Sequence, residues 1–104
     1  MKKSFKIYQI DNNAENARYI KFMGLDFIEE MGLTLTKSLY KEVWSDEIES
    51  DSPNNEKLLD KIFEWFNLYA PENFRGHSLS VSDIIEMDGH YFYCDSYGWK
   101  EVEL

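Results

Sequence analysis

The chain has 104 residues, of which 43 % are apolar and 16 % aromatic, and 20 acidic against 11 basic residues give a net charge of −9. This length suits one domain with one modest core, so we expect residues 1–104 to form a single α+β domain. The apolar content excludes a disordered acidic tail, and the negative charge argues against direct binding to nucleic acid, which depends on Lys and Arg.

The first third of the chain predicts one strand and two short helical segments. Residues 4–10 alternate apolar and polar side chains with the period of a strand. Residues 14–20 can form a helical turn. Residues 25–31 repeat apolar side chains at three- and four-residue spacing, which is typical of a short amphipathic helix, and Gly32 suits its left-handed cap.

The middle of the chain predicts a strand, an acidic link and the clearest helix. Residues 39–44 alternate as a strand, whereas residues 45–51 are so acidic that we expect a solvated link. Ser52 and Pro53 are typical of a helix start. Residues 54–69 follow with an apolar stripe at helical spacing, so this helix should pack on a sheet.

The last third predicts a hairpin and a final short strand. Residues 81–87 and 90–95 are β-prone and flank Asp88-Gly89, a two-residue turn in which both positions accept positive φ. The turn sets the register, which places Met87 opposite His90, Ile85 opposite Phe92, Glu86 opposite Tyr91, Ile84 opposite Tyr93 and Asp83 opposite Cys94. Residues 99–102 can add a strand. We therefore expect a small, mainly antiparallel sheet with a C-terminal hairpin, packed on one face by two helices.

A cysteine–histidine nucleophile can be sought in His77 and Cys94, with Asp83 or Asp95 as orienting carboxylate. The register places Cys94 among apolar neighbours, as a small buried side chain, and no oxyanion-hole glycine turn stands beside it. A hydrolase or nuclease would need a concave pocket that joins at least two of His77, Asp83 and Cys94. We therefore expect no catalytic residues.

The serine-rich run invites a serine-hydrolase interpretation, but Ser78, Ser80 and Ser82 lack a Gly-x-Ser-x-Gly context. We expect their hydroxyls to satisfy backbone groups where the loop becomes a strand. Asp83 should accept hydrogen bonds from this turn, or pair with Arg75 or His77, because a buried carboxylate without partners is costly.

No metal or cofactor is expected. The chain has two histidines and one cysteine without close ligand spacing, and the acids of residues 46–51 lack the glycine and the final glutamate of a calcium loop.

Acidic side chains and surplus aromatics predict a surface for a protein partner. The best candidates are the acids of the link together with two aromatics of the following helix: Asp46, Glu47, Glu49, Asp51, Trp65 and Tyr69. Such a surface attracts a protein with a basic groove, for example a groove that normally holds nucleic acid. The alternative is that the charge serves solubility alone.

The cellular compartment is predicted from three features that the sequence lacks. Cys94 cannot form an internal disulfide, no apolar run approaches the roughly 18 residues of a membrane helix, and no apolar region follows the basic start. We expect a cytoplasmic protein that does not associate with membranes.

Two segments are distinctive, FRGHSLSVSDII at 74–85 and YFYCDSYGW at 91–99. With Tyr8-Gln9 and residues 18–23, they closely resemble the YodL-like domain family over nearly the whole chain. The family pattern shows the serine-rich run, the hairpin and an aspartate-serine-aromatic-glycine turn, although Phe-Gly-Phe is commoner than Tyr97-Gly98-Trp99. The resemblance implies a structural motif that consists of Arg75, His77, Ser78, Ser80, Ser82, Asp83, Asp95 and Gly98, and it carries over no catalytic positions.

Members of this family look like accessory proteins of plasmids and conjugative elements. Some small acidic proteins of such elements are anti-CRISPR inhibitors of the type II effector nuclease. The leading hypothesis is thus a non-enzymatic acidic inhibitor that competes with nucleic acid for the basic groove of such a nuclease. The alternative is a protein-interaction module of conjugative elements without inhibitory role, and the residues predict no particular oligomeric state.

Overall fold

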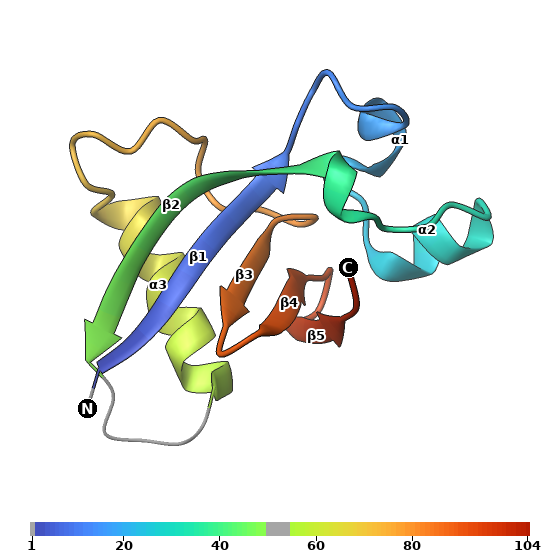
Figure 1. The fold of residues 1–104 in the computed structure, drawn as a ribbon. Helices are drawn as coiled ribbons and strands as arrows, with labels where there is room; N and C mark the ends of the chain where they lie inside the picture. Colours follow the sequence, from blue (N-terminus) through green and yellow to red (C-terminus); the bar gives the residue numbers. More distant parts are fainter. Residues whose placement is uncertain (1, 50–54) are drawn as a thin grey trace.

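The computed structural model describes residues 2–49 and 55–104. The elements are β1 (Lys2–Ile10), α1 (Ala17–Ile20), α2 (Leu25–Glu30), the 3-10 turn η1 (Lys37–Leu39), β2 (Tyr40–Glu49), α3 (Asn55–Leu68), β3 (Ile84–Met87), β4 (His90–Cys94) and β5 (Trp99–Val102). The strands form one sheet in the order β2-β1-β3-β4-β5, in which all neighbours are antiparallel (Figure 1). The predicted α+β class is confirmed.

The β3–β4 hairpin has the predicted register, with Ile84 opposite Tyr93 and Met87 opposite His90. Asp88 and Gly89 have φ values of 53° and 83°, so both turn residues are left-handed, as a tight hairpin of this kind requires. The strand begins at Ile84 rather than at residue 81, and a second hairpin, β4–β5, ends the chain.

The prediction of a solvated acidic link is wrong for residues 45–49, because β2 continues through them to Glu49. Cross-strand pairing with β1 explains the difference, because β1 places Lys2 opposite Glu49 and Lys6 opposite Ser45, within this segment. Lysines on the neighbouring strand offset a charge density that by itself disfavours a strand. Asp51 and the predicted helix start at Ser52 and Pro53 lie outside the described residues.

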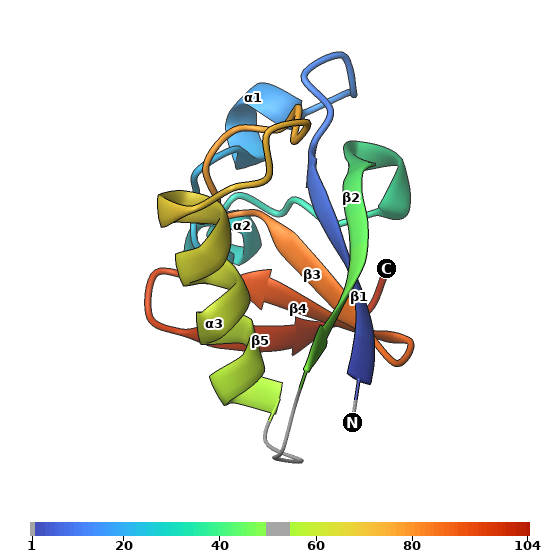
Figure 2. The same cartoon turned by 90° about the vertical axis from the view of Figure 1, so that its left-hand side faces the viewer.

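Helix α3 covers one face of the sheet. Its buried stripe packs against alternate residues of β1 and β3 in one cluster: Leu58, Leu59, Ile62 and Phe66 with Phe5, Ile7, Ile85 and Met87. Figure 2 shows α3 running alongside the sheet. The helix predicted for residues 54–69 is confirmed over Asn55–Leu68, and residue 54 lies outside the described residues.

A second cluster lies on the opposite face, because its strand residues Tyr8, Ile84 and Tyr93 alternate with those that face α3. They pack with buried residues of α1, α2 and η1: Ala17, Ile20, Ile28 and Leu39. Figure 1 shows α2 and α3 on opposite sides of β3 and β4. The two predicted helices thus divide between the faces instead of sharing one. The periodicity of each helix says which of its sides is apolar but not which sheet face receives it.

Candidate functional site

Two of the predicted partner-binding residues, Trp65 and Tyr69, line one shallow hollow of about 300 Å³ with Ile48 of β2. Glu64 and Lys61 complete its lining. Trp65 is half-buried, and its ring lies 4.7 Å from that of Phe66, whereas Tyr69 is 73 % exposed. We call these five lining residues the α3 hollow. It combines Trp65, which packs against Phe66, with Tyr69, which is mostly exposed.

The predicted acids that the structure describes, Asp46, Glu47 and Glu49, do not all lie on the side of β2 that faces this hollow. Strand alternation places Asp46 on the same face as Ile48, and Glu47 and Glu49 on the other face. Asp46 is held by Trp44, whose indole Nε1 donates to its Oδ2 at 3.2 Å. Only Asp46 of these three therefore shares a face with the α3 hollow, to which Glu64 adds a second acid.

The carboxylate of Asp83 is the centre of a buried network, as predicted. Asp83 is 1 % exposed, and its Oδ2 accepts from Ser80 N at 2.9 Å and from Gln9 Nε2 at 3.1 Å. His77 Nε2 lies 4.0 Å from Oδ1, whereas Arg75 is exposed and makes no pair with Asp83. Burial raises the pKa of Asp83 to about 6, although Ser80, His77 and Gln9 each act to lower it.

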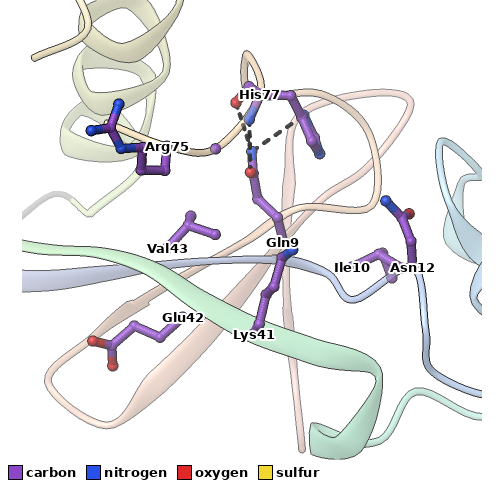
Figure 3. A pocket seen from close by; sticks show the side chains of 9 residues that line it. Gln9, Ile10, Asn12, Lys41, Glu42, Val43, Arg75 and His77 are labelled. Atoms are coloured by element: carbon purple, nitrogen blue, oxygen red, sulfur yellow. Dashed lines mark hydrogen bonds between the residues drawn. The ribbon is translucent and has the colours of Figure 1, made fainter. Parts of the chain in front are cut away.

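Gln9 ties the loop of residues 75–77 to β1. In the sequence it stood out only within the Tyr8-Gln9 pair of the family resemblance, which gave it no role. Its Oε1 accepts from His77 N at 3.1 Å and its Nε2 donates to His77 O at 2.8 Å, as the dashed lines in Figure 3 show for the amide. Gly76 lies so close that a Cβ there would meet Gln9 Oε1 and the Phe74 ring. This contact requires glycine at position 76.

His77 lines a hollow of about 470 Å³ with Gln9, Asn12, Lys41 and Arg75, among others (Figure 3). Neither ring nitrogen is available there. Nδ1 donates to the carbonyl of Ser78 at 2.7 Å, and Nε2 is shielded from solvent, without a hydrogen-bond partner among the described residues. Asp83 does not line this hollow, so an imidazole meets a carboxylate beneath the surface rather than in the cavity.

Cys94 is buried, and burial together with the nearby carboxylate of Asp83 raises the pKa of its thiol to about 12. Such a thiol stays protonated near neutral pH and is a poor nucleophile. None of the hollows described joins two of His77, Asp83 and Cys94.

The serines act mostly through their backbones, which differs from the prediction. Only Ser82 uses its hydroxyl as expected, since Oγ accepts from Phe22 N at 3.0 Å. Ser82 has a φ of 88°, and its carbonyl accepts from the Tyr40 hydroxyl at 2.7 Å. Ser78 and Ser80 contribute a carbonyl and an N–H, and Ser80 Oγ is buried without a partner in the described chain.

A further hollow, of about 450 Å³, escaped the sequence analysis. It lies between α2 and the turn of residues 95–98, and its lining is Gly24, Asp26, Phe27, Asp95, Ser96, Tyr97 and Lys100. Phe27 was expected in the buried stripe of its helix but is 39 % exposed, and Met31 is exposed too. Only Ile28 of that stripe is fully buried, because α2 rests on the sheet along a narrow line. A spacing of 70 residues between α2 and the turn leaves no local signal for this hollow.

Two negative findings apply to residues 2–49 and 55–104. No group of three or more His, Cys, Asp or Glu side chains could hold a metal ion there. No helix in these ranges is long and apolar enough to cross a membrane.

The comparisons with known proteins give one match. The model of the YodL-like domain matches residues 4–104. No curated protein and no solved structure matches the chain.

Proposed function

The chain belongs to the YodL-like domain family, and from this premise we propose that it is a non-enzymatic domain that binds a protein with a basic surface. The observation that carries the proposal is the α3 hollow, where Trp65 and exposed Tyr69 stand beside Ile48 and Glu64. Trp and Tyr side chains contribute much of the binding energy at many protein interfaces, because each buries a large apolar area.

The net charge of −9 supports a basic partner, because long-range attraction between opposite charges speeds encounter. The finer part of the proposal is that the partner is a defence nuclease of the type II CRISPR class, and that the domain competes with RNA or DNA for its groove. The family resemblance to accessory proteins of mobile elements and the acidic charge are its support.

The absence of catalysis is likewise a proposal. It is supported by the His77 ring, whose Nδ1 is engaged by Ser78 and whose Nε2 is shielded, and by the protonated thiol of Cys94. A general base must reach the proton that it removes, and neither group reaches a hollow in that way.

Affinity purification from cells that carry a type II nuclease and its guide RNA tests the proposal. We expect the wild-type domain to retain the nuclease, and the double variant Trp65→Ala/Tyr69→Ala to lose it by at least about tenfold, the scale of one aromatic hot spot. Leu68→Ala is the matched control, because Leu68 is an exposed apolar residue of the same helix outside the hollow. It should retain binding.

Three outcomes contradict parts of the proposal. Binding that is unchanged in 1 M salt argues against charge attraction, which is screened at that concentration. Capture of transfer proteins such as a relaxase, without the nuclease, supports the interaction-module alternative instead of inhibition. Full retention by the Trp65→Ala/Tyr69→Ala variant removes the α3 hollow from the interface.

A further inference from the structure

The hollow between α2 and the turn of residues 95–98 presents two aromatic rings and two carboxylates to solvent. Phe27 and Tyr97 both line it, and Tyr97 is 92 % exposed at the tip of its turn. Asp26 and Asp95 line it as well. We call these four side chains the α2 cage.

The cage is held in place by its own backbone contacts. Asp95 Oδ1 accepts from Leu25 N at 3.0 Å, which fixes the start of α2, and from Ser96 N at 2.8 Å. Gly24 packs against this carboxylate so closely that a Cβ would stand 2.9 Å from Oδ1. Asp95 N donates to Gly98 O at 2.9 Å and closes the turn. Phe27 and Tyr97 are therefore carried by two segments that are fastened together.

The two carboxylates keep free acceptor capacity. Within the described residues, Asp26 makes no hydrogen bond or ion pair, and Asp95 uses only Oδ1. An aromatic face attracts a cation, and a planar guanidinium can stack on a ring while it donates to a carboxylate. Aromatic rings beside carboxylates that still have free acceptor atoms are thus the chemistry that recognises an arginine side chain.

We infer that the α2 cage binds an arginine side chain of a partner protein, whose guanidinium lies against Phe27 and Tyr97 and donates to Asp26 and Asp95. The inference rests on the proposed function, since it specifies how a basic partner is recognised at a second place on the domain. A second copy of the chain does not fit as occupant, because two molecules of charge −9 repel each other.

Lys100 lends the inference an unusual test. It is the one base in the lining, and it makes no ion pair within the described chain. Its positive charge opposes a bound guanidinium. Replacement of Lys100 by an acid should therefore strengthen arginine binding, which is the opposite of what damage to the fold would cause.

The experiment is an NMR titration of the isotope-labelled protein with N-acetyl-arginine amide at low salt. The neutral isostere N-acetyl-citrulline amide is the matched ligand control. We expect saturable shifts confined to α2 and residues 95–100 with arginine, and none of that size with citrulline. Tyr97→Ala should abolish the saturable shifts, and its side chain is so exposed that the fold does not depend on it.

Variants that change one charge test whether arginine affinity shifts in the expected direction. Asp26→Asn should weaken arginine binding about threefold and Lys100→Glu should strengthen it about threefold, the effects of one exposed charge contact. Glu30→Gln is the matched control, because Glu30 is an exposed acid of α2 outside the cage. It should leave affinity nearly unchanged.

Equal shifts with citrulline, shifts spread over the whole surface, or weaker binding by Lys100→Glu would overturn the inference. The proposed function fails separately. If arginine titrates the cage but no basic protein is ever captured, the proposed function is lost. If capture through Trp65 and Tyr69 succeeds while arginine leaves the cage unshifted, only the cage assignment is lost.

Discussion

Single residues matter most around Asp83, where burial and hydrogen bonding act in opposite directions. Burial raises the pKa of this carboxyl from 3.8 to about 6, despite donation from Ser80 N and Gln9 Nε2. The folded protein therefore holds the Asp83 proton more tightly than the unfolded chain does. Stability from this group is fully present below about pH 3.8 and is lost as pH rises through about 6.

We predict that the free energy of unfolding falls between pH 4 and pH 7 by up to about 3 kcal/mol on account of Asp83, which is the energy of a pKa difference of this size. Asp83→Asn should remove this share of the pH dependence, since it removes the titrating group. Urea unfolding of both proteins at the two pH values measures the difference. Parallel pH profiles for wild type and variant would show that Asp83 is not the group involved.

At the scale of elements, short helices depend on residues that are distant in the sequence. Helix α2 has six residues, and its preceding residue Gly24 offers no side-chain cap. Isolated helices of this length are unstable in water. The cap that Asp95 supplies, directly after β4, therefore contributes to the formation of α2. The strand that continues through residues 45–49 depends in the same way on lysines of β1.

We predict that Asp95→Ala lowers the free energy of unfolding by about 1–2 kcal/mol, because Leu25 N and Ser96 N lose their acceptor. Hydrogen exchange should accelerate in α2 more than in α3. Asp26→Ala is the control, since Asp26 lies in the first turn of α2 but caps no N–H that the structure describes. An equal rise in exchange in both helices would mean that Asp95 supports the fold as a whole rather than α2.

For the whole molecule, the net charge of −9 is incompletely neutralised within the described residues. Lys3 lies 3.3 Å from Asp88 and Lys6 3.5 Å from Glu42, and both pairs are at least partly exposed, so each stabilises the fold little. The surplus of acidic over basic side chains produces more repulsion in the folded state than in the expanded unfolded chain.

We predict that added sodium chloride, from about 10 mM to about 500 mM, raises the thermal midpoint of unfolding, because screening at a Debye length of a few ångströms relieves this repulsion. Differential scanning calorimetry in the two buffers measures the effect. A midpoint that falls with salt would mean that attractive ion pairs outweigh repulsion, and the surplus charge would then be less available to a partner.

Local chemistry was enough to predict several elements. The Asp88-Gly89 turn determined the hairpin register, because both residues accept positive φ and the side-chain period of two then leaves one pairing. The apolar stripe of α3 and the end of α2 at left-handed Gly32 followed from periodicity and backbone freedom. The family resemblance, carried by residues 74–99 above all, is confirmed by the match over residues 4–104.

Which residues form the surface hollows and the buried networks was determined only by the tertiary structure. Whether residues 45–49 form a strand or stay solvated depends on pairing with β1. Whether α2 and α3 pack on the same face of the sheet depends on the path of the chain between each helix and the strands. Gln9 meets Asp83 across 74 residues and Leu25 meets Asp95 across 70. A sequence reports the preferences of neighbouring residues, whereas hollows, burial and raised pKa values arise between segments that only the fold brings into contact.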